Sequence, residues 1–349
     1  MAQADISSRS YELPDTIEAI EFYYEHGLTD GLPVIPPTQE RVQEFLSYVN
    51  REPGHIIAIM PGFDITITAE KVAINAVMAG CLPEYMPVVL AAVEAMAEPQ
   101  FHSKAIASTC ECTAPLIVIN GPIRHKINVN SGYNLFGPGW RANATIGRAL
   151  RLILMNVCGE IPGVLDKATF GQPGRYTYCI AENEELSPWE PFHVERGFPP
   201  EASTVTLFAA EGPHEVPDHT SNTPEQLLGI IATSMAGIPY GFGEVMVVIG
   251  PEHLRVLTPS GWSKQQIKHF LLEKAKDRRP QIIDLEDPLN YFGGNSALPG
   301  DIKSTPSLGP AEDIMVIVAG GGAGAHTSII PGWFGGFSTR TVTKFIKEP

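Results

Sequence analysis

Hydrophobic residues recur along the chain in two patterns, and each pattern predicts a different kind of element. Apolar residues three and four positions apart predict helices at 17–24, 38–48, 68–80, 83–97, 143–159, 223–235 and 263–276. Short apolar runs bounded by turn residues predict strands at 56–60, 104–108, 115–119, 203–208, 244–249 and 314–319. From residue 203 onward strands and helices alternate, a pattern typical of a parallel α/β sheet.

These elements predict an α/β fold with a mostly parallel or mixed sheet and flanking helices. We expect two lobes with a long ordered loop between them, because 349 residues are enough for two lobes or one large domain. The predicted parts are an N-terminal strap and helix (1–30), an N-terminal α/β lobe that carries the loop (31–200) and a C-terminal α/β lobe (201–349).

The loop lies within Thr109–Gly159, the most unusual stretch of the chain. It follows a Cys-Glu-Cys turn and a short apolar run, and is rich in Gly, Pro, Asn and Arg. A loop of this length inside a compact protein is usually functional or disordered. Its aromatic residues, such as Tyr133 and Trp140, argue against disorder. We therefore predict an ordered loop that faces the substrate.

Cationic and amide side chains in this loop form an outlier in an acidic chain. The proposed substrate-binding residues are Arg124, Asn130, Asn134, Arg141 and Asn143. Arginine binds carboxylates in a bidentate manner, and asparagine both donates and accepts hydrogen bonds, so a small anionic substrate is expected. The alternative is that the asparagines hold turns and the arginines pair with nearby acids.

Histidines follow three predicted strands in the C-terminal half. The groups concerned are His214, Asp218 and His219, then His253, then His326. Ligands of α/β proteins lie beyond the carboxyl ends of the strands, so these groups are expected at one edge. Imidazole and carboxylate suit a divalent metal (Zn, Fe or Mn) or a general acid/base pair.

The predicted roles within this group are as follows. His214 and Asp218 are the candidate catalytic residues, and His214, His219, His253 and His326 are the candidate metal ligands. The alternative for any single histidine is that it caps a helix or binds a backbone carbonyl.

Cysteine chemistry gives a second hypothesis. Cys110 would be a reacting thiol with Cys112 resolving it, provided that the thiol pKa is lowered. With Cys81 as a third ligand, the pair would suit an iron–sulfur hydro-lyase. The alternative is that cysteines are small buried residues, and we favour it for Cys158 and Cys179.

Composition excludes several classes of function. The net charge of −15 argues against nucleic-acid binding. No nucleotide cofactor is expected, because the glycine run 320–324 lacks the spacing of dinucleotide and P-loop motifs. No apolar run predicts a membrane helix or secretory signal. An odd number of cysteines does not suggest disulfides, so a cytoplasmic protein is expected.

Several segments resemble a bacterial family that is itself uncharacterised. They are DGLPVIPPT (30–38), GCLPEYMPVVLAAVEAM (80–96), NGPI (120–123), GPGWRANATIGRALRL (137–152), GPEH (250–253) and GWSK (261–264). Members of that family look like the larger partners of small UGSC-type (seleno)proteins in catabolic gene clusters. The resemblance implies small-molecule metabolism in a bacterial cytoplasm and a small partner protein. It also implies no obligatory role for Cys112.

Three functional hypotheses follow. The first is a metal-assisted or acid/base lyase or hydrolase that acts on a small anionic or polar substrate. The second is a cysteine-based redox or nucleophilic enzyme that uses Cys110, or an iron–sulfur hydro-lyase. The third is a non-catalytic ligand-binding subunit of a complex. In each case we expect a homo-oligomer.

Overall fold

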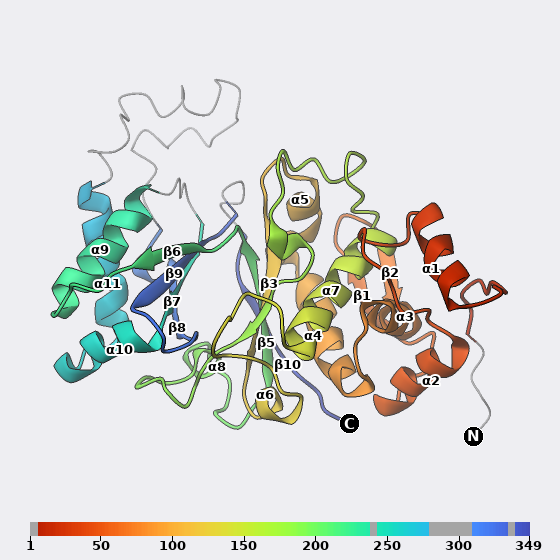
Figure 1. The fold of residues 1–349 in the computed structure, drawn as a ribbon, viewed down its shortest axis with the longest axis horizontal. Helices are drawn as coiled ribbons and strands as arrows, with labels where there is room; N and C mark the ends of the chain where they lie inside the picture. Colours follow the sequence, from red (N-terminus) through yellow and green to blue (C-terminus); the bar gives the residue numbers. More distant parts are fainter. Residues whose placement is uncertain (1–5, 238–242, 279–308, 334–338) are drawn as a thin grey trace. The chain divides into compact units, whose positions relative to one another are not determined.

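The computed structural model describes residues 6–237, 243–278, 309–333 and 339–349 (Figure 1). The chain forms two compact units. Unit 1 contains residues 1–182, 191–210 and 340–349, and unit 2 contains residues 183–190 and 211–339. Within the described residues, no helix is long and apolar enough to cross a membrane.

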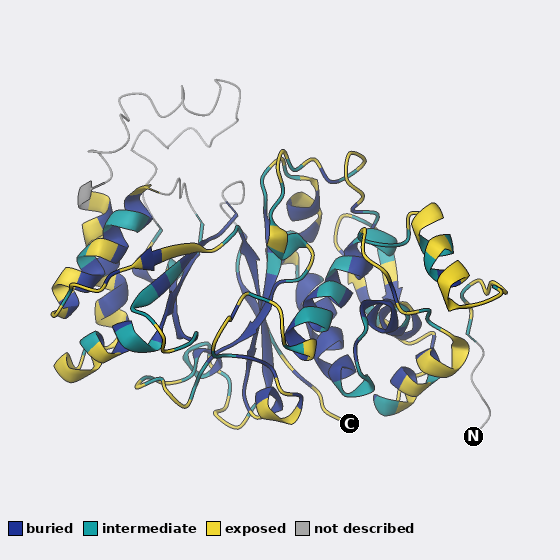
Figure 2. Ribbon diagram, in the orientation of Figure 1, coloured by how far each residue is buried: buried dark blue, intermediate teal, exposed yellow. Residues whose placement is uncertain are grey.

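Unit 1 is built on a mixed four-stranded sheet in the order β10-β5-β3-β4. The strands are β3 (Ala114–Asn120), β4 (Cys179–Ala181), β5 (Thr204–Ala210) and β10 (Val342–Phe345). β3 runs parallel to β4 and antiparallel to β5, and β5 pairs antiparallel with β10. All residues of β5 are buried, as its unbroken apolar and threonine sequence predicts for a strand covered on both faces (Figure 2).

Helices flank this sheet and form most of the N-terminal part of unit 1. They are α1 (Thr16–Glu25), α2 (Gln39–Tyr48), α3 (Ala69–Ala79), α4 (Met86–Met96), α5 (Ser103–Ser108), α6 (Ile123–Lys126), α7 (Arg141–Asn156) and α8 (Phe192–Glu195). A hairpin of β1 (Ile56–Met60) and β2 (Ile65–Thr68) leads into α3. Every residue of α4 except Glu94 is buried, because this helix is apolar all round.

Unit 2 has its own four-stranded mixed sheet, in the order β6-β9-β7-β8. The strands are β6 (His214–Pro217), β7 (Val245–Ile249), β8 (Ile314–Val318) and β9 (His326–Pro331). β7 and β8 are parallel, whereas β9 is antiparallel to both β6 and β7. One face packs against α9 (Pro224–Gly237), α10 (Pro251–Leu257) and α11 (Lys264–Arg278) through a single apolar core.

The α/β prediction with mixed sheets and flanking helices is confirmed. The strand predicted at 104–108 is wrong: these residues belong to α5, and Lys, Ala and Ser favour a helix in a run too short to show a period. The alternation after residue 203 also spans two sheets, because β5 belongs to unit 1. Thr109–Gly159 lies within unit 1 rather than between two lobes.

Element bounds differ in smaller ways. The predicted boundary at 200 lies before β5, and the structure keeps that strand with the N-terminal unit. Helix α7 begins at Arg141, two residues before Asn143, because the extended backbone of Trp140 is its N-cap. The sequence of 277–311 is rich in Pro and Gly and predicts an irregular segment, most of which lies outside the described residues.

Candidate functional site

One edge of the unit 2 sheet gathers polar residues from three strands and the loops that follow them. Pro217 pairs with His326, and Ile249 pairs with Thr327, so the ends of β6 and β7 lie beside the start of β9. β8 runs parallel to β7 and therefore ends at the same edge. The edge thus receives Asp218, His219, His253, His326 and the glycine run 320–324. We call this set, together with Glu215, the edge cluster.

His326 is held by a carboxylate on one side. Its Nδ1 lies 3.1 Å from Oε1 of Glu215. Glu215 lies two residues before Pro217, the strand partner of His326, so both side chains project from the same face of the sheet. Within the described residues this contact is an ion pair and not a hydrogen bond, because Nδ1 of His326 has no hydrogen-bond partner there. The negative charge of Glu215 nevertheless favours a proton on Nδ1, which leaves the lone pair on Nε2.

His219 lies beside His326. The two ring centroids are 5.6 Å apart, and the rings are nearly perpendicular, at 86°. Gly324 makes room for them: a Cβ at this position would lie 2.8 Å from Nε2 of His326 and 3.9 Å from Cε1 of His219. The close approach of the backbone to the ring of His326 therefore favours a glycine here, whereas the 3.9 Å to His219 is an ordinary contact.

His253 occupies a different environment, although it comes from the same edge. It is buried at the start of α10, where Nε2–H donates to the backbone oxygen of Asp218 (3.0 Å) and Nδ1 accepts from the hydroxyl of Thr327 (2.8 Å). Burial lowers its pKa, against smaller opposing effects of Asp218. Both ring nitrogens are thus committed, and His253 holds the backbone that carries Asp218 and His219.

Asp218 carries unused bonding capacity. Its Oδ1 accepts hydrogen bonds from the amide and hydroxyl of Thr220 (both 2.9 Å) and the amide of Ser221 (3.2 Å). Its Oδ2 is buried and has no partner in the described part of the chain. Burial would raise its pKa, but the hydrogen bonds from Ser221 and Thr220 outweigh it and hold the pKa of Asp218 at about 2. This carboxylate is ionised beside the histidines.

His214 is not brought to this edge. The segment expected to be a loop forms β6, in which Val216 is buried and its neighbours are exposed. His214 pairs with Ile329 at the far end of that strand. Three residues of strand separate it from Pro217, a length of about 10 Å. The expectation failed because β5, the strand thought to deliver His214, belongs to the other sheet.

The fit of a metal ion can be tested on these side chains. Catalytic zinc sites use three protein ligands. Within the residues that the structure describes, no three His, Cys, Asp or Glu side chains lie where they could hold one ion. His219 and His326 supply two imidazoles, and Glu215 would be an outer partner of His326. The described edge cluster thus lacks a third ligand.

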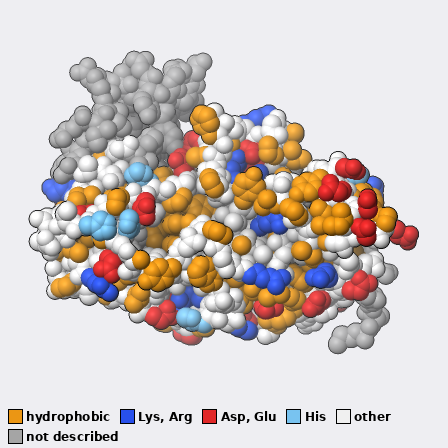
Figure 3. All heavy atoms as spheres, viewed as in Figure 1, with side chains coloured by type: hydrophobic (Ala, Val, Ile, Leu, Met, Phe, Trp, Pro, Cys, Tyr) orange, Lys and Arg blue, Asp and Glu red, His pale blue; other side chains and the backbone are white. Residues whose placement is uncertain are grey.

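Figure 3 shows histidine side chains gathered on the surface of unit 2, next to acidic side chains. His219 is exposed and His326 is partly exposed, so a solute can reach both rings. The arrangement therefore offers imidazoles and carboxylates at an accessible sheet edge, a combination suited to proton transfer.

The predicted substrate loop of unit 1 uses its polar side chains internally. Asn143 is buried: its Oδ1 accepts from the amide of Asn130 (2.8 Å), and its Nδ2 donates to the carbonyls of Asn130 (3.1 Å) and Cys179 (3.0 Å). Arg124 is also buried and donates to the carbonyls of Gly121 and Glu182. These contacts match the alternative in which such residues hold turns.

The remaining loop residues are exposed. Asn134 donates from Nδ2 to the carbonyl of Pro138 (2.8 Å), and its φ of 56° places it in the left-handed region that asparagine tolerates. Arg141 donates from Nε to the carbonyl of Gly80 (3.0 Å), and the residue is exposed to solvent. Of the five predicted residues, Arg141 best retains the capacity to bind an anion.

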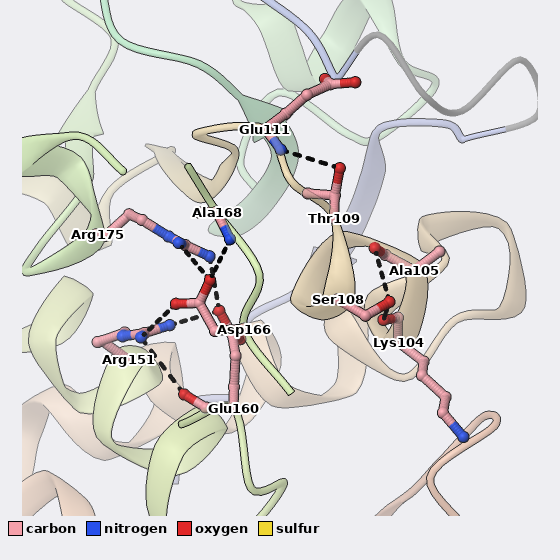
Figure 4. A network of polar contacts seen from close by, with 10 residues as sticks. All are labelled: Lys104, Ala105, Ser108, Thr109, Glu111, Arg151, Glu160, Asp166, Ala168 and Arg175. Carbon is pink, nitrogen blue, oxygen red and sulfur yellow. Dashed lines mark hydrogen bonds and ion pairs between the residues drawn. The ribbon is translucent and has the colours of Figure 1, made fainter. Parts of the chain in front are cut away.

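The Cys-Glu-Cys turn is also in unit 1, and it is anchored by backbone contacts. The amide of Glu111 donates to the hydroxyl of Thr109 (3.2 Å), and the amide of Thr169 donates to the carbonyl of Cys110 (2.8 Å). Figure 4 shows a charged network beside this turn, in which Arg151 and Arg175 bind the buried carboxylates of Glu160 and Asp166. The network fixes the segment that carries Thr169.

The five thiols differ in accessibility. Cys110 is exposed and Cys112 is partly exposed, whereas Cys81, Cys158 and Cys179 are buried. Burial raises the pKa of Cys81 and of Cys158 to about 12 each, and it also raises the pKa of Cys179. The Cys81 thiol donates to the carbonyl of Thr145 (3.3 Å). These three buried thiols are therefore protonated and unreactive at neutral pH.

Glu215, Gly324 and Thr327 were not predicted as site residues. Their contribution depends on strand register, which the sequence does not show, although Glu215 does alternate with the buried Val216. Comparisons of the chain with protein-family models and with curated proteins find no match.

Proposed function

We propose that the protein is an enzyme of acid–base type, a lyase or hydrolase, that acts on a small anionic or polar molecule at the edge cluster. The observation that carries this proposal is the 3.1 Å approach of Oε1 of Glu215 to Nδ1 of His326, whose Nε2 lies beside Gly324 and whose ring lies beside that of His219. In many enzymes a carboxylate lies beside one ring nitrogen of a histidine, and the other ring nitrogen acts as the general base.

In this proposal His326 accepts a proton from the substrate at Nε2. Glu215 keeps the ring in the required tautomer and stabilises the imidazolium that forms. His219, whose ring lies 5.6 Å from that of His326, transfers a second proton to or from the leaving group. The two adjacent rings would therefore act as base and acid on one small molecule bound at this edge of the sheet.

The glycine run supports an anionic substrate. Within the described residues, the backbone amides of residues 320–324 donate no hydrogen bond to the protein. Free amides of a glycine-rich turn can form a nest for an anion. Asp218 is the opposing charge at this edge, and its repulsion would orient the anionic end of the substrate away from Oδ2.

A substrate panel tests the proposal. Purified protein would be incubated with small hydroxy acids, unsaturated acids, lactones and amides, and turnover would be followed by NMR. His326→Gln should lower the rate of any reaction found by at least about 100-fold, the usual contribution of general base catalysis. His269→Gln, which changes an exposed histidine of α11, is the matched control. Full activity of His326→Gln would end the proposal.

A thiol mechanism is the second candidate, and one observation favours it. Of the five cysteines, Cys110 alone is exposed, on a turn that the backbone contacts of Thr109 and Thr169 hold in place. Cys112, two residues away, could resolve an oxidised Cys110. Loss of turnover in Cys110→Ser, with retention in His326→Gln, would favour this mechanism.

Turnover by the isolated chain would also exclude a non-catalytic ligand-binding subunit, the third hypothesis. The family resemblance supports a role in small-molecule metabolism in a bacterial cytoplasm. A homo-oligomer and a small partner protein remain part of this proposal. Size-exclusion chromatography with light scattering measures the first, and co-purification from the native host measures the second.

A further inference from the structure

Unit 1 contains a cavity that the proposed function does not use. Its volume is about 750 Å³, within the range of cavities that hold small molecules. It lies among α1, α2, α3 and the end of α7, and the N-terminal segment 6–16 runs across it. This segment we call the strap.

The strap is fastened to α3 by one buried carboxylate. Glu70, only 1% exposed, accepts hydrogen bonds from the amide (3.1 Å) and hydroxyl (3.0 Å) of Ser7 and from the amide of Ser8 (2.7 Å). Burial raises the pKa of Glu70, but the hydrogen bonds of Ser8 and Ser7 lower it by more. The cavity is therefore closed on this side by an ordered segment of the chain.

One stripe of α3 forms the wall of the cavity. Lys71, Ile74, Asn75 and Met78 all line it, and they recur at the three- and four-residue spacing of one helix face. Along this face the side chains run from the cationic Lys71 to the apolar Ile74 and Met78. The distance along the helix axis from Lys71 to Met78 is about 10 Å. Phe22 of α1 extends the apolar part.

The charged end of the stripe favours an anion. Lys71 donates to the hydroxyl of Ser8 (3.3 Å), and within the described residues no carboxylate pairs with its ammonium group. The two acids of the lining, Asp15 and Glu40, are in the first turns of helices α1 and α2, where they bind helix amides or Thr38. The cavity thus has a cation at one end without an acidic partner.

We propose that this cavity binds a small amphipathic carboxylate, with the carboxylate at Lys71 and an apolar body along Ile74, Met78 and Phe22. A carboxylate beside the ammonium group of Lys71 forms a charge-assisted hydrogen bond, and burial of the apolar body removes hydrophobic surface from water. The site consists of unit 1 residues and is separate from the edge cluster of unit 2, so this inference does not depend on the proposed reaction.

Calorimetric titration of the full chain with decanoate tests this inference, with decylamine as the cationic counterpart. One decanoate should bind per chain, and decylamine should bind at least about tenfold more weakly. Lys71→Gln should weaken decanoate binding about tenfold. Its matched control, Lys347→Gln, removes another exposed lysine of unit 1 and should leave binding unchanged.

A filling variant provides the second arm. Ile74→Trp should abolish decanoate binding, whereas Ile59→Trp, at a 63% exposed position of β1, should not. Circular dichroism and thermal unfolding check that each variant is folded. Absence of decanoate binding to the unmodified chain, equal binding of decylamine, or decanoate binding that survives both Lys71→Gln and Ile74→Trp would overturn the inference.

Discussion

The edge cluster of unit 2 and the asparagine-rich loop of unit 1 look alike in sequence but differ in how their polar groups are used. In the loop, the side chain of Asn143 makes three hydrogen bonds to backbone and is buried. At the edge, Oδ2 of Asp218 has no partner in the described chain, and His219 is exposed beside His326. The loop therefore stabilises its own conformation, while the edge retains capacity to bind and to exchange protons.

This difference shows why composition alone misplaces a site. Asparagine and arginine in a glycine-rich loop suggest substrate binding, yet the loop must satisfy its own backbone groups first. Unused bonding capacity, rather than polarity, distinguishes the two regions. The predictions below test that distinction, and they are ordered by the size of the expected effect.

Removing a loop amide should cost far more stability than removing an edge imidazole. Asn143→Ala should lower the free energy of unfolding by about 3 kcal/mol, because it leaves buried backbone groups of Asn130 and Cys179 without partners. His219→Ala should change it by less than about 0.5 kcal/mol. Urea unfolding measures the free energy of unfolding of both variants. Similar losses of stability in the two would contradict the distinction between the loop and the edge cluster.

Adding one methyl group at the edge should displace the ring of His326. Gly324→Ala would place Cβ 2.8 Å from Nε2 of His326, so the ring must move away. We expect a loss of about 1–3 kcal/mol in stability, the usual cost of overpacking, together with loss of any activity found. Gly322→Ala, in the same loop with an exposed residue, is the control. A fully active and stable Gly324→Ala would show that the rings are not closely fitted there.

The pH dependence of stability should report the buried histidine. His253 has a lowered pKa in the folded state, so it stays neutral there while the unfolded chain takes up a proton. Its contribution to stability is therefore complete above its ordinary pKa of 6.5 and is lost as the pH falls below that value.

Thermal unfolding between pH 8 and pH 5 measures this effect. The midpoint of the unmodified protein should fall in that interval more than that of His253→Gln, which keeps a polar group but cannot titrate. Equal falls in both proteins would mean that another group carries the dependence. Asp218 should act at lower pH, since its pKa of about 2 makes its contribution disappear as the pH falls from 3.8 toward 2.

The sequence predicted the elements better than it predicted the site. Helices such as α2 and α3 were predicted from a periodic apolar face. The first residue of each predicted range, Thr38 or Thr68, is the N-cap of the observed helix. Buried strands such as β7 and β8 follow from their unbroken apolar runs. Strands β6 and β9 were missed. β6 is a four-residue edge strand containing His, Glu and Pro, and such a strand has a weak local signal. β9 has six residues and also begins with His and ends with Pro.

The site depended on these missed strands. Register between β6 and β9 brings Glu215 to His326 and removes His214 from the cluster, and no local pattern encodes that register. The ends of β7 and β8 did predict that His253 and His326 share an edge, because these two strands are parallel. His219 reaches that edge from β6 and not from β5, the strand expected to deliver it. Which of these rings is committed to structure could be decided only from its hydrogen bonds.

We propose that Glu215 prepares His326 as a base with the lone pair on Nε2. An NMR measurement of the ¹⁵N-labelled histidine rings identifies the protonated nitrogen of each neutral imidazole. Neutral His326 should carry its proton on Nδ1 and Glu215→Gln should abolish this preference, while His253 should carry its proton on Nε2 in both proteins. A proton on Nε2 of His326 in the unmodified protein would contradict the claim.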